Sequence, residues 1–92
     1  MEFHTVKNIT PLPDLMLMAE FHDGAIKVYD VKPLMDEIPV FKMLDYVYGL
    51  FEQVRVDIGG YGVIWNDEID LSCDELYENG RDLPNERRTE RI

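Results

Sequence analysis

Apolar and polar side chains alternate along the stretch from Leu15 to Val31, and the alternation breaks once, at Asp23-Gly24. An Asp-Gly pair within such an alternation is the strongest short-range signal of a β-hairpin. A two-residue loop at this position would set the register of the two strands. The resulting cross-strand pairs are Phe21 with Ile26, Glu20 with Lys27, Ala19 with Val28, and Met18 with Tyr29. The pattern therefore predicts a hairpin with one apolar face and an opposite-charge pair on the other.

Two further β segments are expected. A weaker alternation from Phe3 to Thr10 predicts an N-terminal strand that ends at Pro11, because proline cannot donate to a strand ladder. A second hairpin is predicted around Gly59-Gly60, since glycine readily adopts the positive φ of a tight turn. Its apolar face would hold Val54, Val56 and Ile58 on one strand and Tyr61, Val63 and Trp65 on the other. In this register Val56 meets Val63 and Val54 meets Trp65, and a longer loop would change the pairing.

Three short helices are expected, at about residues 33–37, 45–51 and 72–79. Asp30 precedes the first, and Pro33 is tolerated in a first helical turn. Asp45 is a candidate cap for the second, which would present Val47, Leu50 and Phe51 on one face.

The third helix has the clearest start signal. Leu71, Ser72, Glu75 and Leu76 have the spacing of a capping box and a hydrophobic staple, and Asn79-Gly80 suits a left-handed C-terminal cap.

Together these elements predict an α+β fold: a small, mostly antiparallel sheet made of two hairpins and an N-terminal strand, with three short helices. The chain of 92 residues has room for one core, so residues 1–80 are expected to form a single domain. Residues 81–92 hold seven charged and two apolar residues, a composition that predicts a mobile charged tail.

The charge of the chain restricts its partners. The net charge is −10, and residues 1–80 hold 5 Lys and Arg against 16 Asp and Glu. Such a surface repels a phosphate backbone, so no direct binding of nucleic acid is expected. An acidic surface suits a basic partner, although solubility alone is an equally good explanation of the charge.

No signal for a membrane span or for secretion is present, which predicts a protein of the cytoplasm with no membrane partner. The lone Cys73 has no partner for an internal disulfide.

No residues form a recognisable catalytic or metal-binding motif, so we expect neither an enzyme nor a cofactor. His4 and His22 have no nucleophile at a typical spacing. The density of Asp67, Glu68, Asp70 and Asp74 suggests a cation site, but their spacing is not that of a calcium-binding loop. Among the aromatic residues, core packing is the default expectation for Phe51 and Trp65. Tyrosines that face outward are candidates for an interface, because Tyr and Trp are enriched at binding hot spots, and the sequence does not identify which of them these are.

Several short motifs follow one another in an order that is more specific than any of them alone. They are F-x-D-G at 21–24, D-x-x-P-L at 30–34, F-x-x-V-x-V-D at 51–57, I-W-N at 64–66, I-D-L at 69–71 and L-Y at 76–77. In this order they resemble the bacterial family called domain of unknown function 2442, over about residues 3–80. The resemblance implies a small α+β domain and no established activity.

The resemblance also bears on partners. Some relatives carry a helix-turn-helix domain after this one. Many are encoded beside a small protein of domain of unknown function 4160, in arrangements that resemble toxin–antitoxin pairs.

Two hypotheses of function follow. The first is a non-catalytic protein-interaction domain, an antitoxin-like partner that covers a small basic protein. The alternative is a small regulatory or sensor module that binds a ligand or cation near Trp65 to Asp74. The candidate interaction residues are Asp30, Asp57, Trp65 and Asp70. Pairing with a second copy through an open sheet edge is a further expectation.

Overall fold

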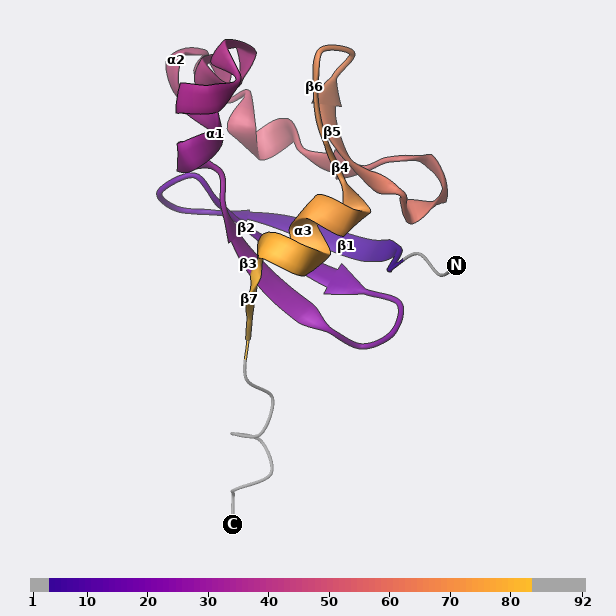
Figure 1. Ribbon diagram of the computed structural model, residues 1–92. Helices are drawn as coiled ribbons and strands as arrows, with labels where there is room; N and C mark the ends of the chain where they lie inside the picture. Colours follow the sequence, from indigo (N-terminus) through magenta and orange to yellow (C-terminus); the bar gives the residue numbers. More distant parts are fainter. Residues whose placement is uncertain (1–3, 84–92) are drawn as a thin grey trace.

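The computed structural model describes residues 4–83 (Figure 1) and has the predicted α+β fold. A four-stranded antiparallel sheet has the strand order β1-β2-β3-β7, and a three-stranded sheet has the order β4-β5-β6. The strands are β1 (Val6–Leu12), β2 (Met16–Phe21), β3 (Ile26–Asp30), β4 (Arg55–Val56), β5 (Gly62–Asn66), β6 (Ile69–Ser72) and β7 (Arg81–Asp82). The helices are α1 (Lys32–Glu37), α2 (Met43–Tyr46) and α3 (Cys73–Asn79), with 3₁₀ turns η1 (Pro39–Lys42), η2 (Phe51–Gln53) and η3 (Ile58–Gly60).

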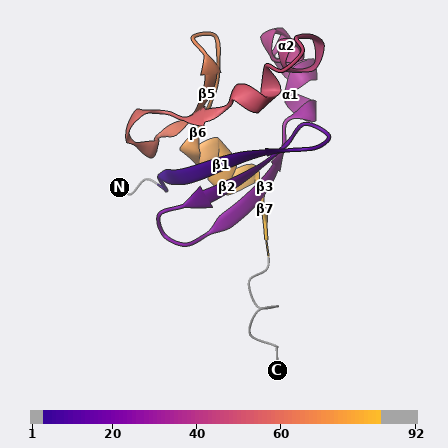
Figure 2. The same ribbon diagram turned by 180° about the vertical axis from the view of Figure 1, so that it is seen from behind.

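Helix α3 lies on one face of the four-stranded sheet, in front of the strands in Figure 1 and behind them in Figure 2. It packs against β3 and also against β5 and β6, so it joins the two sheets. The largest fully buried side chains come from both sheets, from α3 and from the start of α1: Phe21, Leu17, Ile69, Leu76, Val6, Val31 and Val63. The described part of the chain therefore has one shared core.

The first hairpin is present, but its predicted register is wrong by one residue. Its loop has three residues, because the Phe21 N–H donates to the Ala25 carbonyl at 2.9 Å and Gly24 takes a φ of +95°. A three-residue loop with glycine in the left-handed region is the next most common hairpin geometry. Ala19 consequently lies opposite Lys27, and the predicted Glu20–Lys27 pair does not form.

Strand β1 continues through Pro11 to Leu12, beyond its predicted end. Proline is tolerated here because β1 is an edge strand and needs no outward N–H. A bulge between Val6 and Asn8 places Val6 opposite Phe21 and Ile9 opposite Ala19, so Val6 and Ile9 share a face that a regular strand would not give them.

In the second hairpin the predicted pairing of Val56 with Val63 is confirmed. The two-residue turn is wrong, since η3 forms a wider loop in which Gly59 and Gly60 take φ of +76° and +77°. Ile58 lies in this loop and is 91% exposed instead of joining the apolar face.

A third hairpin, β5–β6, was not predicted. Asn66 forms its turn by accepting hydrogen bonds from the N–H groups of Glu68 and Ile69 at 2.9 and 3.1 Å.

Helix α1 confirms the first predicted helix, and the Asp30 carboxylate accepts a hydrogen bond from the Lys32 N–H near its start. The predicted helix over 45–51 is wrong. Helix α2 ends at Tyr46 with Asp45 inside it, and Gly49 takes a φ of +81°, which no α-helix accommodates. No helix in the described range 4–83 is long and apolar enough to span a membrane.

Helix α3 confirms the third prediction, since the Ser72 hydroxyl oxygen accepts a hydrogen bond from the Glu75 N–H at 3.1 Å. The predicted left-handed cap is wrong, because Gly80 has a φ of −77° and the chain continues directly into β7. Arg81 and Asp82 pair with Val28 and Lys27 of β3. The sheet thus extends past the expected boundary at residue 80, while the rest of the expected tail, residues 84–92, lies outside the described residues.

A hydrogen bond between Tyr29 and Glu75 connects the sheet to α3. The Tyr29 hydroxyl donates to the Glu75 carboxylate at 2.7 Å, and burial together with this carboxylate raises the pKa of Tyr29 well above its usual value.

The contribution of Tyr29 to stability is therefore expected to be fully present and constant up to about pH 10, the pKa of an unfolded tyrosine, and to be lost progressively at higher pH. Only the unfolded state can then ionise the hydroxyl. Urea unfolding at several alkaline pH values measures this, and a Tyr29→Phe variant should lack that part of the pH dependence. An unchanged alkaline loss of stability in the variant would contradict the assignment.

Candidate functional site

The four residues predicted as interaction candidates lie on four different elements or loops, of which β5 and β6 are paired strands. Asp30 ends β3, Asp57 precedes η3, Trp65 belongs to β5, and Asp70 belongs to β6. The Asp57 carboxylate accepts a hydrogen bond from the Ile58 N–H at 2.8 Å and so stabilises the loop. Asp70 is exposed on the strand opposite Ile64.

Trp65 is a core residue in this structure. Its side chain is 2% exposed, its ring lies near those of Phe41 and Phe51, and its indole N–H donates to the Phe51 carbonyl at 3.0 Å. A side chain held in this way offers no surface to a partner. Sequence alone could not make this distinction, because tryptophan is common both in cores and at hot spots.

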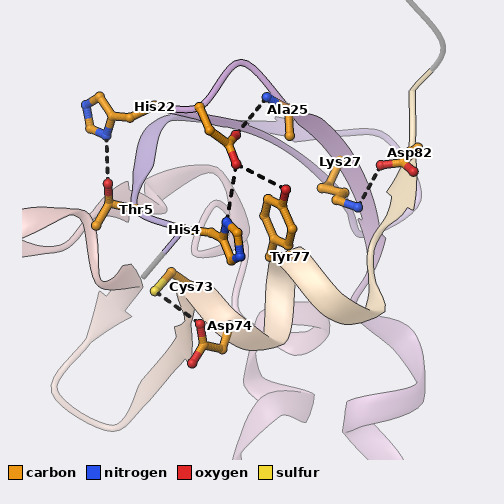
Figure 3. A network of polar contacts seen from close by, with 10 residues as sticks. His4, Thr5, His22, Ala25, Lys27, Cys73, Asp74, Tyr77 and Asp82 are labelled. Atoms are coloured by element: carbon orange, nitrogen blue, oxygen red, sulfur yellow. Dashed lines mark hydrogen bonds and ion pairs between the residues drawn. The ribbon is translucent and has the colours of Figure 1, made fainter. Parts of the chain in front are cut away.

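The acidic stretch near Trp65 does not form a cation site within the described range. Residues 4–83 contain no group of three or more His, Cys, Asp or Glu side chains placed to hold a metal ion. The Asp74 carboxylate instead lies 4.0 Å from the thiol of the buried Cys73, which donates to it (Figure 3).

A polar network at the tip of the first hairpin joins three distant segments (Figure 3). The Tyr77 hydroxyl of α3 donates to Asp23 Oδ2 at 3.1 Å, and His4 Nδ1 lies 3.2 Å from the same oxygen. The His4 ring stacks on the Tyr77 ring at 3.6 Å, and Lys27 Nζ lies 4.6 Å from the centre of the Tyr77 ring. His4 and Tyr77 are 19 and 54 positions away from Asp23 in the sequence, so no local motif could have predicted the network.

A histidine, a carboxylate and a hydroxyl converge here, but their hydrogen bonds favour a structural role. The Ala25 N–H, above all, lowers the pKa of Asp23, and the hydrogen bonds from Tyr77 and His4 add to this effect. The hydrogen bond to Asp23 raises the pKa of Tyr77, which keeps its hydroxyl protonated. The network therefore fastens the hairpin tip to α3 and to the segment before β1.

Replacing Asp23 by asparagine is expected to lower the free energy of unfolding by less than about 1 kcal/mol, because the carboxylate is largely exposed. A lowered pKa contributes stability above the unfolded pKa that is lost as the pH falls through the folded value. The difference between wild type and variant should thus shrink in acid, as measured by urea unfolding at neutral and acidic pH. The control is Asp70→Asn, and an equal effect of the control would contradict a special role for Asp23.

An open cleft of about 700 Å³ lies at the other end of the first sheet, between the β1–β2 turn and the segment from α2 to η2. Its lining combines apolar residues with three carboxylates and includes no Lys or Arg: Leu12, Pro13, Asp14, Leu15, Leu44, Asp45, Val47, Tyr48, Gly49, Phe51 and Glu52. In Figures 1 and 2 this end of the molecule also carries α1 and α2, on the side away from η3.

Lys32 holds one wall of the cleft in place. Asp14 and Leu15 take left-handed φ values of +67° and +57°, which cost about 1–3 kcal/mol each in a residue other than glycine. Lys32 Nζ donates to the Asp14 carbonyl at 2.7 Å and pairs with the carboxylates of Asp14 and Asp30 at 3.3 and 2.9 Å. Burial disfavours the charged form of Asp30, but the hydrogen bonds from Lys32 outweigh it and lower its pKa. These contacts offset the strain of the turn.

Five large apolar side chains are exposed in α2 and the segments next to it, and two of them, Val47 and Tyr48, line the cleft: Ile38, Met43, Tyr46, Val47 and Tyr48. Tyr46 is 73% exposed, and Tyr48 is as exposed as in an extended chain. The predicted helix over 45–51 places Val47 on its packed face, whereas α2 ends at Tyr46 and leaves Val47 exposed. We call these five residues together with the cleft the apolar end of the molecule.

The profile of the family described as "Protein of unknown function (DUF2442)" matches residues 6–82, from the first residue of β1 to the last of β7. No curated protein matches the chain, and no solved structure does. The match agrees with the order of motifs in the sequence and covers the whole of both sheets. The chain belongs to the DUF2442 family.

Proposed function

We propose that this chain is a non-catalytic protein-interaction domain, an antitoxin-like partner that covers a small basic protein in the cytoplasm. The observation that carries the proposal is the apolar end of the molecule, where Tyr46, Val47 and Tyr48 are exposed together on a strongly acidic chain. Exposed apolar patches bordered by polar residues are typical of protein interfaces.

The residue types suit this role. Tyrosine is enriched among hot-spot residues, because it buries a large area and can still form a hydrogen bond. The excess of 16 acidic over 5 basic residues in positions 1–80 would accelerate the encounter with a basic protein and select against acidic ones. Together these properties supply both apolar contact and charge complementarity.

The test is copurification of the tagged chain from its native host at low salt, followed by mass spectrometry. We expect to recover a small basic protein at a stoichiometric ratio to the chain. The same small protein, produced recombinantly, should then bind the purified chain. Affinity should fall as salt is added, since exposed charges are screened. Recovery of no protein at low salt, or of a partner whose binding is independent of salt, would count against the proposal.

A further inference from the structure

We propose that the cleft between the β1–β2 turn and η2 seats an apolar side chain of the partner, and that Asp45 and Glu52 bind Lys or Arg side chains flanking it. The inference rests on the proposed function and adds to it the docking site and the chemistry of the docked segment. The segment would be a short stretch of a basic protein with an apolar residue between basic ones.

The apolar part of the inference rests on the residues that line the cleft. Leu44 and Phe51 belong to the core and are only 3% and 4% exposed, so they close the floor of the cleft rigidly but offer little surface themselves. The apolar contact area comes from the walls of the cleft. Leu12 and Leu15 are half-buried in the wall formed by the β1–β2 turn. An apolar side chain placed against them would lose contact with water at little cost in reorganisation, and about 0.8 kcal/mol is gained for each buried CH₂ group.

The charged part rests on the carboxylates at the cleft. Asp14 is already paired with Lys32, as described above. The side chains of Asp45 and Glu52 are exposed and form no hydrogen bond or ion pair with any residue in the range 4–83. Two unpaired carboxylates beside an apolar floor favour a cationic over a neutral or acidic segment.

The shape of the cleft is set before any partner arrives. Lys32 holds the strained turn on one side, and the left-handed Gly49 places Tyr48 outward on the other. A preformed site costs less conformational entropy on binding than one that must order first. Tyr48 is therefore available to cover the seated side chain.

The chain's own basic residues are a possible competitor, because Arg87, Arg88, Arg91 and Ile92 have the chemistry assigned to the partner. The described chain ends at Leu83, whose N–H donates to Ile26 next to the hairpin tip. The cleft lies beside the opposite end of the sheet, where β3 ends at Asp30 and the β1–β2 turn begins. The test below therefore includes a variant in which Arg87, Arg88 and Arg91 are replaced by glutamine.

The experiment is an NMR titration of the full chain with a short Lys/Arg peptide that has one central leucine. We expect backbone amide shifts concentrated at residues 12–15 and 44–52, and several-fold weaker binding of a peptide with central alanine. Asp45→Lys combined with Glu52→Lys should weaken binding of the leucine peptide by about tenfold or more. The matched control, Asp67→Lys combined with Asp70→Lys, makes the same change of net charge on the exposed β5–β6 hairpin and should have a much smaller effect.

Shifts located elsewhere, equal binding of both peptides, or equal effects of the two charge-reversed variants would overturn the inference. A second copy of the chain as occupant would also overturn the inference. It would appear as shifts at the cleft residues that depend on protein concentration before peptide is added, and that disappear when Arg87, Arg88 and Arg91 are replaced by glutamine. These outcomes are distinct from failure of the proposed function, which would appear as the absence of a copurifying protein while the peptide still binds the cleft.

Discussion

Replacing Trp65 by alanine is expected to lower the free energy of unfolding by about 3–5 kcal/mol, as for other buried tryptophans. The side chain is 2% exposed and its ring lies near those of Phe41 and Phe51, so its loss leaves a cavity. It also removes the indole N–H that donates to the Phe51 carbonyl, which keeps only the longer hydrogen bond from the Val54 N–H at 3.4 Å. A domain of this size has a total stability near the low end of about 5–15 kcal/mol. The variant should therefore be largely unfolded at moderate temperature, as measured by circular dichroism and urea titration.

A milder substitution separates packing from binding. Trp65→Phe keeps an aromatic ring but removes the indole N–H, and loss of its hydrogen bond to the Phe51 carbonyl should cost about 0.5–1.5 kcal/mol, because that carbonyl still accepts from the Val54 N–H. The folded variant should bind the partner as wild type does. If Trp65→Phe kept its stability and lost binding instead, Trp65 would be an interface residue, as its place among the predicted interaction candidates implies.

Replacing Tyr48 by alanine is expected to weaken binding of the copurified partner about tenfold, corresponding to about 1.4 kcal/mol, without lowering the stability of the fold. Tyr48 is fully exposed beside the cleft, so its removal takes away contact area for a partner and nothing from the core. Isothermal titration calorimetry gives the affinity, and urea unfolding gives the stability of the same preparation.

The matched control is Ile58→Ala. Ile58 is 91% exposed in η3 and does not line the cleft, and its removal should leave the affinity within error. An equal loss of affinity in both variants would mean that exposed apolar area anywhere on the surface contributes to binding. If Tyr48→Ala kept the affinity of the wild type, the partner would not dock at the apolar end of the molecule.

The elements of the fold were largely predictable, because their signals are local. Ser72 and Glu75 are three residues apart, and their hydrogen bond depends only on the start of α3. Gly24, Gly59 and Gly60 take positive φ, as expected for the turns of two hairpins. The order of family motifs added the overall class of fold, and the α+β architecture agrees with it.

The candidate site was not predictable in the same way. Asp45 suggested a helix start, and the helix was therefore expected to run to residue 51 with Val47 buried. The left-handed conformation of Gly49 is incompatible with a helix through residue 49, and without that helix Val47 and Tyr48 are exposed to solvent. The cleft then needs the β1–β2 turn, some 30 residues earlier in the chain, to supply its second wall.

The sequence by itself determines the turns and the start of α3, because φ preferences and helix capping depend on residues within a few positions of one another. It also determines the acidic character of the chain, because net charge depends on composition alone. The packing of distant segments decided the remaining features. An Asp-Gly turn permits a loop of two or three residues, and the three-residue loop places Leu17, Ala19 and Phe21 on the core face with Tyr29. Burial and long-range contacts such as Asp23 with Tyr77, 54 residues apart, fix the register, the core position of Trp65 and the shape of the cleft.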